Sequence, residues 1–138
     1  MKATIVDTNV LVDFFQPSSP WQRWCDRRLE EAKRLGPVVI NPIILAELAA
    51  GFPNLELLNA TLSPALVERE DLPWDAAFLA GKAYLSYRRA GGDRRSPLPD
   101  FYIGAHAAVK AYRLLSRDAA RYRAYFPSLE LIAPDTHP

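Results

Sequence analysis

The chain has 138 residues and a formal net charge of +1, with 49% hydrophobic and 24% charged residues. This composition is typical of one globular domain, residues 1–138, and excludes disordered and fibrous chains; a charge so near zero does not by itself predict a polyanionic partner. The single cysteine, Cys25, excludes a disulfide framework and a thiolate metal cluster. The sequence shows neither a signal peptide nor a membrane span, so we expect a soluble, cytoplasmic protein with no membrane partner.

Short apolar runs predict the strands of a buried parallel sheet. In chain order the runs are residues 3–6, 38–40, 113–115 and 129–132. Helical patterns lie between them, and proline, asparagine and glycine mark their ends. The expected helices are residues 20–36, 42–51, 54–62, 73–90, 100–112 and 118–126. In the helix 73–90, Trp74, Phe78 and Leu85 share one side.

Strands that alternate with helices predict a layered α/β fold with right-handed crossovers. In such folds ligands bind beyond the carboxyl ends of the strands. The places of acidic residues relative to those ends therefore indicate whether the chain has a site there.

Charges are unevenly distributed along the chain. Residues 82–123 hold 10 basic and 3 acidic side chains, whereas the rest of the chain holds 7 basic and 13 acidic ones. Thirteen of the 17 basic residues are arginine, whose planar guanidinium group suits two-point contact with phosphate or carboxylate. The bias favours an anionic ligand on the second half, although a solvated helix surface would produce the same pattern.

Three aspartates stand at or near expected carboxyl ends of strands. Asp7 follows residues 3–6 directly, where a strand passes into a helix, and Asp118 stands just beyond residues 113–115. Asp100 begins the helix that leads to the second of these strands. Each aspartate can be a simple helix cap or a member of a shared metal site, and no single one decides between the two.

Glu47 is the one charged residue in an otherwise apolar helix. Every other residue between Ile43 and Phe52 is apolar or glycine, so we expect this helix to be buried on most sides. An ionised carboxylate in such a place costs several kcal/mol unless it is paired or binds a cation. No lysine or arginine neighbours Glu47 within the helix, so a cation is a good candidate for its partner.

If three or four of these acids meet at one end of the sheet, they would form a divalent metal site. Two carboxylates about 4 Å apart repel each other by roughly 4 kcal/mol at an effective dielectric constant of about 20, so a cluster of them requires a counterion. Oxygen ligands without cysteine or histidine select a hard ion, Mg²⁺ or Mn²⁺. Such an ion makes a bound water a natural nucleophile and offsets the charge that develops on a phosphodiester.

Other catalytic chemistries lack their motifs in the sequence. His106 lies six residues after Asp100, which on a helix turns it away from that carboxylate, so we expect it to pack or to make a supporting contact. His137 stands in the tail. The sequence shows no nucleophile elbow, no P-loop and no dinucleotide-binding fingerprint.

Four stretches give the chain a resemblance to a known family. They are IVDTNVLVDFF at residues 5–15, INPIILAELAAGF at 40–52, LPDFYIGAHAAVKAYRLLSRD at 98–118 and RYRAYFPSLELIAP at 121–134. Together they resemble PIN-domain proteins, and most of all the VapC-like toxins of type II toxin–antitoxin pairs. The resemblance implies a three-layer α/β/α sandwich around a parallel sheet of four to five strands.

In that family four acids build a Mg²⁺ or Mn²⁺ site for RNA cleavage. The resemblance gives this role to Asp7, Glu47, Asp100 and Asp118. It gives supporting roles to Thr8, Asn9 and Ser116, with Asn9 orienting the first aspartate. It also implies an RNA substrate, a homodimer and a cognate antitoxin whose tail occupies the active-site groove.

The expected function is therefore a Mg²⁺- or Mn²⁺-dependent endoribonuclease that is the toxin of a toxin–antitoxin pair. The expected RNA contacts are Arg94, Arg95 and Arg117, the first two because they stand in a loop after two glycines. A housekeeping PIN nuclease without an antitoxin is one alternative. A signalling module of the receiver type also gathers acids around Mg²⁺, but the strand ends offer no obvious lysine. A phosphatase with an aspartyl nucleophile requires a second aspartate where Asn9 stands.

Overall fold

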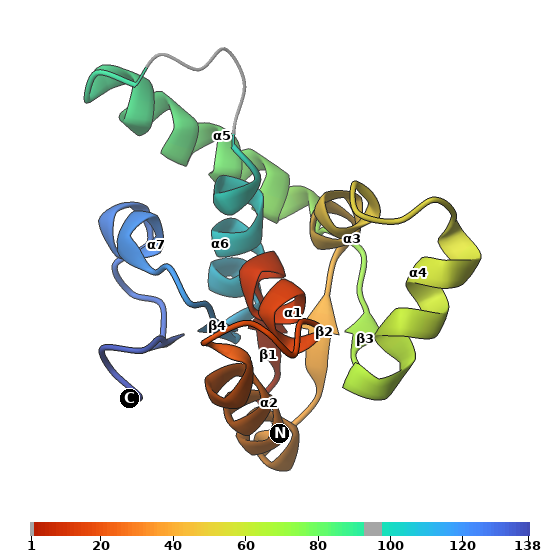
Figure 1. The fold of residues 1–138 in the computed structure, drawn as a ribbon. Helices are drawn as coiled ribbons and strands as arrows, with labels where there is room; N and C mark the ends of the chain where they lie inside the picture. Colours follow the sequence, from red (N-terminus) through yellow and green to blue (C-terminus); the bar gives the residue numbers. More distant parts are fainter. Residues whose placement is uncertain (1, 93–97) are drawn as a thin grey trace.

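The computed structural model describes residues 2–92 and 98–138, which form a sheet of five strands with helices around it (Figure 1). The strands are β1 (Thr4–Val6), β2 (Val38–Ile40), β3 (Glu68–Arg69), β4 (Arg113–Leu115) and β5 (Leu131–Ile132). All neighbouring strands are parallel, and their order across the sheet is β3-β2-β1-β4-β5. The central strand is therefore β1, which pairs with β2 and β4.

Helices connect the strands in the described part of the chain. They are α1 (Thr8–Phe14), α2 (Gln22–Leu35), α3 (Pro42–Ala49), α4 (Leu55–Leu62), the 3₁₀ turn η1 (Ser63–Ala65), α5 (Trp74–Arg89), α6 (Pro99–Lys110) and α7 (Ala120–Tyr125). With right-handed crossovers this strand order places α1 to α4 on one face of the sheet and α5 to α7 on the other. The expected three-layer α/β/α fold is confirmed. Within residues 2–92 and 98–138, no helix combines the length and hydropathy needed to span a bilayer.

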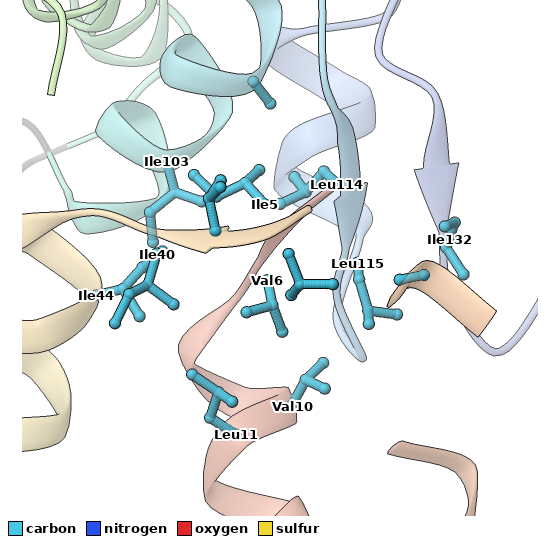
Figure 2. Close-up of a cluster of buried hydrophobic side chains, with 14 of the residues drawn as sticks. Ile5, Val6, Val10, Leu11, Ile40, Ile44, Ile103, Leu114, Leu115 and Ile132 are labelled. Carbon is cyan, nitrogen blue, oxygen red and sulfur yellow. The ribbon is translucent and has the colours of Figure 1, made fainter. Parts of the chain in front are cut away.

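Branched aliphatic side chains pack against both faces of the central strands. Figure 2 shows Ile103 of α6 on one side of the strands and Val10 and Leu11 of α1 on the other. Ile5 and Leu114 are completely buried between these layers. Full burial of each such side chain contributes roughly 2 kcal/mol to folding. Burial on both faces explains why the central strands read as continuous apolar runs.

Asn41 and Pro42 begin α3, as the sequence predicts. The Asn41 side-chain oxygen accepts a hydrogen bond from the backbone N–H of Ile44 (3.0 Å), and Pro42 lies in the first turn, where no N–H is required. Because Asn41 directly follows β2, this cap sets the path of the chain from the sheet to Glu47.

The strand that the apolar runs do not predict is β3. Both of its residues, Glu68 and Arg69, are exposed, and it pairs with β2 at the edge of the sheet. A two-residue edge strand with charged side chains gives no hydrophobic periodicity. The other four strands lie within their expected ranges.

The expectation that the helix around Glu47 is buried on most sides is wrong. Ile44 and Leu48 are buried, but Ala46, Glu47 and Ala49 are exposed. The apolar composition of α3 therefore reflects an exposed apolar surface as well as a core face. Because Glu47 is exposed, the cost of burying its charge gives no reason to expect a cation there.

The large apolar residues of α5 also face outward. Trp74 is 90% exposed and Phe78 is 69% exposed, whereas the buried residues of this helix are Ala76, Ala80 and Ala83. Small alanines let α5 pack closely on α6, and the two helices lie side by side in Figure 1. The larger residues are left as an exposed apolar face.

Candidate active site

A polar pocket of about 350 Å³ opens at the carboxyl ends of β1 and β4. Asp7 directly follows β1 and Ser116 directly follows β4, and the parallel pairing of the two strands brings these residues together. The pocket is lined by Asp7, Thr8, Asn9, Val12, Glu47, Asp100, Arg117 and Asp118. All four acids that the sequence singles out therefore lie on the walls of one pocket.

Asp7 is the most enclosed of these acids, with only 5% of its surface exposed. Its Oδ1 accepts a hydrogen bond from the backbone N–H of Thr8 (2.8 Å), so the residue caps α1. Its Oδ2 accepts hydrogen bonds from the hydroxyls of Ser116 (2.8 Å) and Tyr122 (3.0 Å). The amide of Asn9 donates a longer one to the same oxygen (3.3 Å). Asp7 is thus both a helix cap and a wall of the pocket.

Burial raises the pKa of Asp7 from 3.8 to about 6. The nearby Asp100 carboxylate adds to the rise, while hydrogen bonds from Ser116 and Tyr122 oppose it. The surrounding protein therefore does not fully stabilise the charged form of Asp7. A cation in the pocket would do so.

Glu47 reaches the pocket from α3 and is held there by Thr8. The Thr8 hydroxyl donates a hydrogen bond to Glu47 Oε1 at 2.6 Å. The backbone N–H of Thr8 also donates to Asp7, so one residue contacts two of the acids. The first turn of α1 in this way couples the end of β1 to the middle of α3.

Asp100 lies in the first turn of α6 and is paired with a cation. The Nη1 atom of Arg121 lies 3.0 Å from Asp100 Oδ2. The Tyr122 hydroxyl lies 3.5 Å from Asp100 Oδ1, in addition to its hydrogen bond with Asp7. Two consecutive residues at the start of α7 thus contact this acid.

Asp118 lies in the loop between β4 and α7, and its side chain is exposed. Its backbone N–H donates to Ser116 Oγ (3.1 Å), and the same hydroxyl lies 3.0 Å from the Asp118 carbonyl oxygen. The side-chain oxygen of Asn9 accepts a hydrogen bond from the backbone N–H of Arg117 (3.1 Å). Ser116 and Asn9 therefore join this loop to Asp7, which both of them also contact.

The pocket offers the oxygen ligands that hard divalent cations prefer. In the described part of the chain, no three His, Cys, Asp or Glu side chains converge closely enough to form a ready metal site. Glu47 and Asp100 are instead turned toward Thr8 and Arg121. Among the described residues, the pocket still fits Mg²⁺ or Mn²⁺, because four carboxylates with no cysteine or histidine line it and the side-chain donors to the enclosed Asp7 are neutral. Ligation would require Asp100 to exchange Arg121 for the cation, whereas the hydrogen bond from Thr8 reaches one oxygen of Glu47, Oε1, and can persist.

Arg117 lines the pocket, but its guanidinium group is paired with an acidic side chain of the same chain. Its Nε lies 2.6 Å from Oδ2 of the buried Asp13, and its guanidinium group stands 5.5 Å from the centre of the Trp21 ring. The other two predicted RNA contacts, Arg94 and Arg95, lie outside the described residues.

His106 lies away from the pocket, as expected from its spacing. Its ring is fully buried, with Nδ1 3.1 Å from the side-chain nitrogen of Asn41 and Nε2 3.1 Å from Glu70 Oε1. This pattern fits a neutral ring that accepts from Asn41 and donates to Glu70. His106 supports the cap of α3, and within the described residues it makes no contact with the acids of this pocket.

Tyr122 and Arg121 are the site residues that sequence reasoning misses. The segment RYRAY reads as an ordinary short helix, and Tyr122 is 115 positions from Asp7, so no local pattern connects them. The one available signal is that Tyr122 follows Asp118 by four residues, at the same end of the sheet.

A family model of the PIN domain matches residues 4–127. The chain belongs to the PIN domain family. The matched residues include all four acids of the pocket, together with Tyr122. No sequence among the curated proteins matches this PIN domain.

The sheet order separates this PIN domain from receiver domains. Receiver domains share the flavodoxin-like order 2-1-3-4-5, in which the first strand lies between the second and the third. Here β1 lies between β2 and β4, and β3 is at the edge. The receiver alternative is therefore excluded by topology.

Solved structures share the fold of this PIN domain. VapBC2 from Rickettsia felis, bound to a DNA fragment of its promoter, has a TM-score of 0.74 at 20% identity, over 95% of this chain and 98% of the other. VapBC-1 from nontypeable Haemophilus influenzae has a TM-score of 0.72 at 20% identity, over 95% and 97%. VapC20 from Mycobacterium tuberculosis, a sarcin-ricin loop cleaving toxin, has a TM-score of 0.62 at 18% identity, over 93% and 98%. At these identities the likeness establishes a common fold.

Proposed function

We propose that this PIN domain is a Mg²⁺- or Mn²⁺-dependent endoribonuclease that hydrolyses RNA phosphodiester bonds in the cytoplasm. Its main support is that four carboxylates from four separate segments line one polar pocket. These acids are Asp7, Glu47, Asp100 and Asp118. The likeness in fold to VapC20, a sarcin-ricin loop cleaving toxin, adds support.

The same four acids would hold the cation. When bound, the ion would lower the pKa of a water molecule and neutralise charge on the phosphodiester. Ser116 and Tyr122 hold the carboxylate of Asp7 in place by hydrogen bonds. The exposed positions of Glu47 and Asp118 leave the rim of the pocket open to water and to an RNA backbone.

RNA cleavage by the purified chain, free of any antitoxin, tests this proposal. We expect cutting with Mg²⁺ or Mn²⁺, none with EDTA, and none by Asp100→Asn. Asp75→Asn is a matched control, because Asp75 also lies in the first turn of a helix but is exposed on α5. Intact RNA in the presence of metal and folded wild-type protein would contradict the proposal.

We also propose that Arg94 and Arg95 contact RNA phosphates. Each phosphate contact that is lost should reduce the dependence of RNA affinity on salt concentration. The double change of Arg94 and Arg95 to alanine should therefore weaken binding and flatten the salt slope. An unchanged slope would remove both residues from the interface. Changing Arg117 alone should have a smaller effect on the slope, because Arg117 is paired with Asp13.

We propose that the chain is the toxin of a toxin–antitoxin pair and that its antitoxin occupies an apolar groove beside the pocket. The groove has a volume of about 310 Å³ and is lined by Pro42, Leu45, Ala46, Ala49, Phe52, Asn54, Leu55 and Leu58. It shares α3 with Glu47, so an occupant would lie next to that acid. The fold shared with VapBC2 and VapBC-1 supports this assignment.

Binding to the product of the adjacent reading frame tests the antitoxin proposal. Leu55→Glu should abolish co-purification of the two proteins, because a charge would enter the apolar groove. Leu57→Glu is the control, since Leu57 is an exposed residue of the same helix that does not line the groove. The absence of any interaction would favour a housekeeping PIN nuclease.

We propose that the exposed apolar face of α5 forms a homodimer contact. Trp74 and Phe78 lie four residues apart on α5 and leave two large aromatic side chains exposed, as protein interaction sites often do. Changing both to serine should convert a dimer to a monomer in light scattering. Leu66→Ser removes a similarly exposed residue (72%) outside α5 and should leave the dimer intact. A monomeric wild type would refute the proposal.

A further inference from the structure

Tyr122 places a buried phenol beneath the acidic pocket. Only 1% of its surface is exposed, and it lies on α7, which packs against α6 (Figure 1). Its hydroxyl donates to Asp7 Oδ2 at 3.0 Å and lies 3.5 Å from Asp100 Oδ1. One side chain from α7 thus lies close to two acids, one directly after β1 and one in the first turn of α6.

Close packing fixes the ring of Tyr122. A Cβ atom added at Gly104 of α6 would lie 3.1 Å from Tyr122 Cδ1 and 2.5 Å from Phe126 Cδ2. The absence of a side chain at Gly104 therefore lets the start and end of α7 approach α6 closely. Because the ring is held by packing, loss of its hydroxyl alone should leave the ring in place.

The two oxygens of Asp7 have different surroundings. Oδ2 accepts two short hydrogen bonds, from the hydroxyls of Ser116 (2.8 Å) and Tyr122 (3.0 Å), which occupy its two lone pairs, while the amide of Asn9 lies farther away at 3.3 Å. Oδ1 accepts one hydrogen bond within the described chain, from the backbone N–H of Thr8. Only Oδ1 therefore retains a lone pair for a cation.

We propose that Tyr122 is a positioning residue that limits Asp7 to binding a cation through Oδ1 alone, and that it thereby favours Mg²⁺ and Mn²⁺ over Ca²⁺. Magnesium requires near-octahedral coordination with one oxygen from each ligand, whereas Ca²⁺ accepts more ligands and readily takes both oxygens of a carboxylate. A carboxylate whose second oxygen is occupied by hydrogen bonds is therefore a better ligand for Mg²⁺ than for Ca²⁺. This inference rests on the metal site of the proposed function.

Calorimetric titration of the intact, antitoxin-free chain with Mg²⁺, Mn²⁺ and Ca²⁺ tests the inference. Tyr122→Phe should weaken Mg²⁺ and Mn²⁺ binding by about 10-fold, as loss of a hydrogen bond to a metal ligand generally does. Ca²⁺ binding should fall less, so the ratio of Mg²⁺ to Ca²⁺ affinity should drop. Tyr125→Phe is the matched control, because it removes a hydroxyl from the same helix, and Tyr125 packs its ring against Tyr87 and Phe101.

Ser116→Ala provides a second variant, which removes the other short hydrogen bond to Asp7 Oδ2 and should shift the affinity ratio in the same direction. If circular dichroism shows that Tyr122→Phe is unfolded, this variant tests instead whether hydrogen bonds to Asp7 Oδ2 set the ratio of Mg²⁺ to Ca²⁺ affinity. A wild-type chain that binds none of the three ions would refute the metal site and the inference together. A wild-type chain that binds Mg²⁺, with an affinity ratio unchanged in the folded variants, would refute the inference alone.

Discussion

Arg121 Nη1 lies 3.0 Å from Asp100 Oδ2, so a positive charge from α7 occupies one oxygen of an acid in the candidate metal pocket. The guanidinium group also stands 5.9 Å from the centre of the Tyr87 ring, which helps to hold it in place. In the metal-free protein this pair balances the charge of Asp100. A divalent cation that uses Asp100 must therefore compete with Arg121 or share the carboxylate with it.

Arg121→Met should consequently strengthen Mn²⁺ binding by several-fold. The change keeps the aliphatic stem but removes a charge that repels the ion at short range, and the gain should shrink as added salt screens the repulsion. Titration calorimetry at low and high salt measures both effects. Arg123→Met is the control, because Arg123 lies on the same helix but pairs with the exposed Asp135. Weaker Mn²⁺ binding by Arg121→Met would show that Arg121 supports the site instead of competing for it.

Asp7→Asn should abolish RNA cutting and stabilise the metal-free fold at neutral pH. Burial raises the pKa of Asp7 from 3.8 to about 6, so ionisation opposes folding. One pKa unit corresponds to about 1.4 kcal/mol, so the variant gains at most about 3 kcal/mol. The gain will be smaller than this limit because an amide nitrogen cannot accept the hydrogen bonds that Asp7 accepts.

The pH dependence of this gain follows from the raised pKa. The stability that Asp7 contributes is fully present below pH 3.8 and is lost as the pH rises through about 6. The free energy of unfolding of Asp7→Asn should thus be equal to or lower than that of the wild type at about pH 3, and higher than that of the wild type above about pH 7. Urea unfolding in EDTA across this range measures the difference. A stability difference that does not change with pH would show that ionisation of Asp7 does not destabilise the fold.

Apolar runs and helix caps predict the frame of this fold because both are local features. The strand that ends at Val6 consists of β-branched residues that are all buried, and Asn41 with Pro42 forms a cap within four residues. The strand β3 escapes prediction because it consists of two exposed charged residues whose pairing with β2 is a tertiary contact. Local sequence patterns therefore predict the central strands of the sheet but not its edge strand β3.

The composition of the helix around Glu47 misleads for a different reason. Apolar residues on all sides of a helix indicate burial only if another element covers every side. In α3 one side packs on the core through Ile44 and Leu48, and another side forms an exposed groove with α4. Burial of Glu47 is therefore the wrong reason to place it at the pocket, whereas the resemblance to PIN-domain proteins gives it the same place independently. For Tyr122 the sequence offers only its place four residues after Asp118, because the contact with Asp7 is made by residues 115 positions apart.

Thr8→Val should lower RNA cleavage while leaving the fold nearly as stable as before. The Thr8 hydroxyl is the group that holds the exposed Glu47 toward the pocket, at 2.6 Å, and valine has the same shape without the donor. Loss of such a supporting hydrogen bond should reduce kcat/KM by about 10-fold. Thr61→Val is the control, because the Thr61 hydroxyl donates to the Leu57 carbonyl on α4, away from the acids. Equal activity of the two variants would show that Glu47 does not depend on Thr8.

Glu70 anchors the chain just beyond β3 to α6 and to the start of β4. Its carboxylate accepts hydrogen bonds from the Tyr112 hydroxyl (2.8 Å) and the His106 ring (3.1 Å), and Lys110 Nζ lies 3.8 Å away. Partial burial raises the pKa of Glu70, but the hydrogen bonds from His106 and Tyr112 outweigh this, so the pKa lies below its ordinary value of 4.5. The charged carboxylate therefore stabilises the fold, and through His106 it also supports Asn41, the cap of α3.

Glu70→Gln should destabilise the protein by about 1 kcal/mol at neutral pH, because it weakens two hydrogen bonds to a charged acceptor. A lowered pKa means that the contribution of Glu70 is fully present above pH 4.5 and is lost as the pH falls through the lower pKa of the folded state. The difference between wild type and variant should therefore shrink in urea unfolding curves recorded at successively lower pH. Glu68→Gln, an exposed change in β3, should show no such difference at any pH. If Glu70→Gln lowers the free energy of unfolding by the same amount at low pH, the side chain of Glu70 stabilises the fold through its shape and not through its charge.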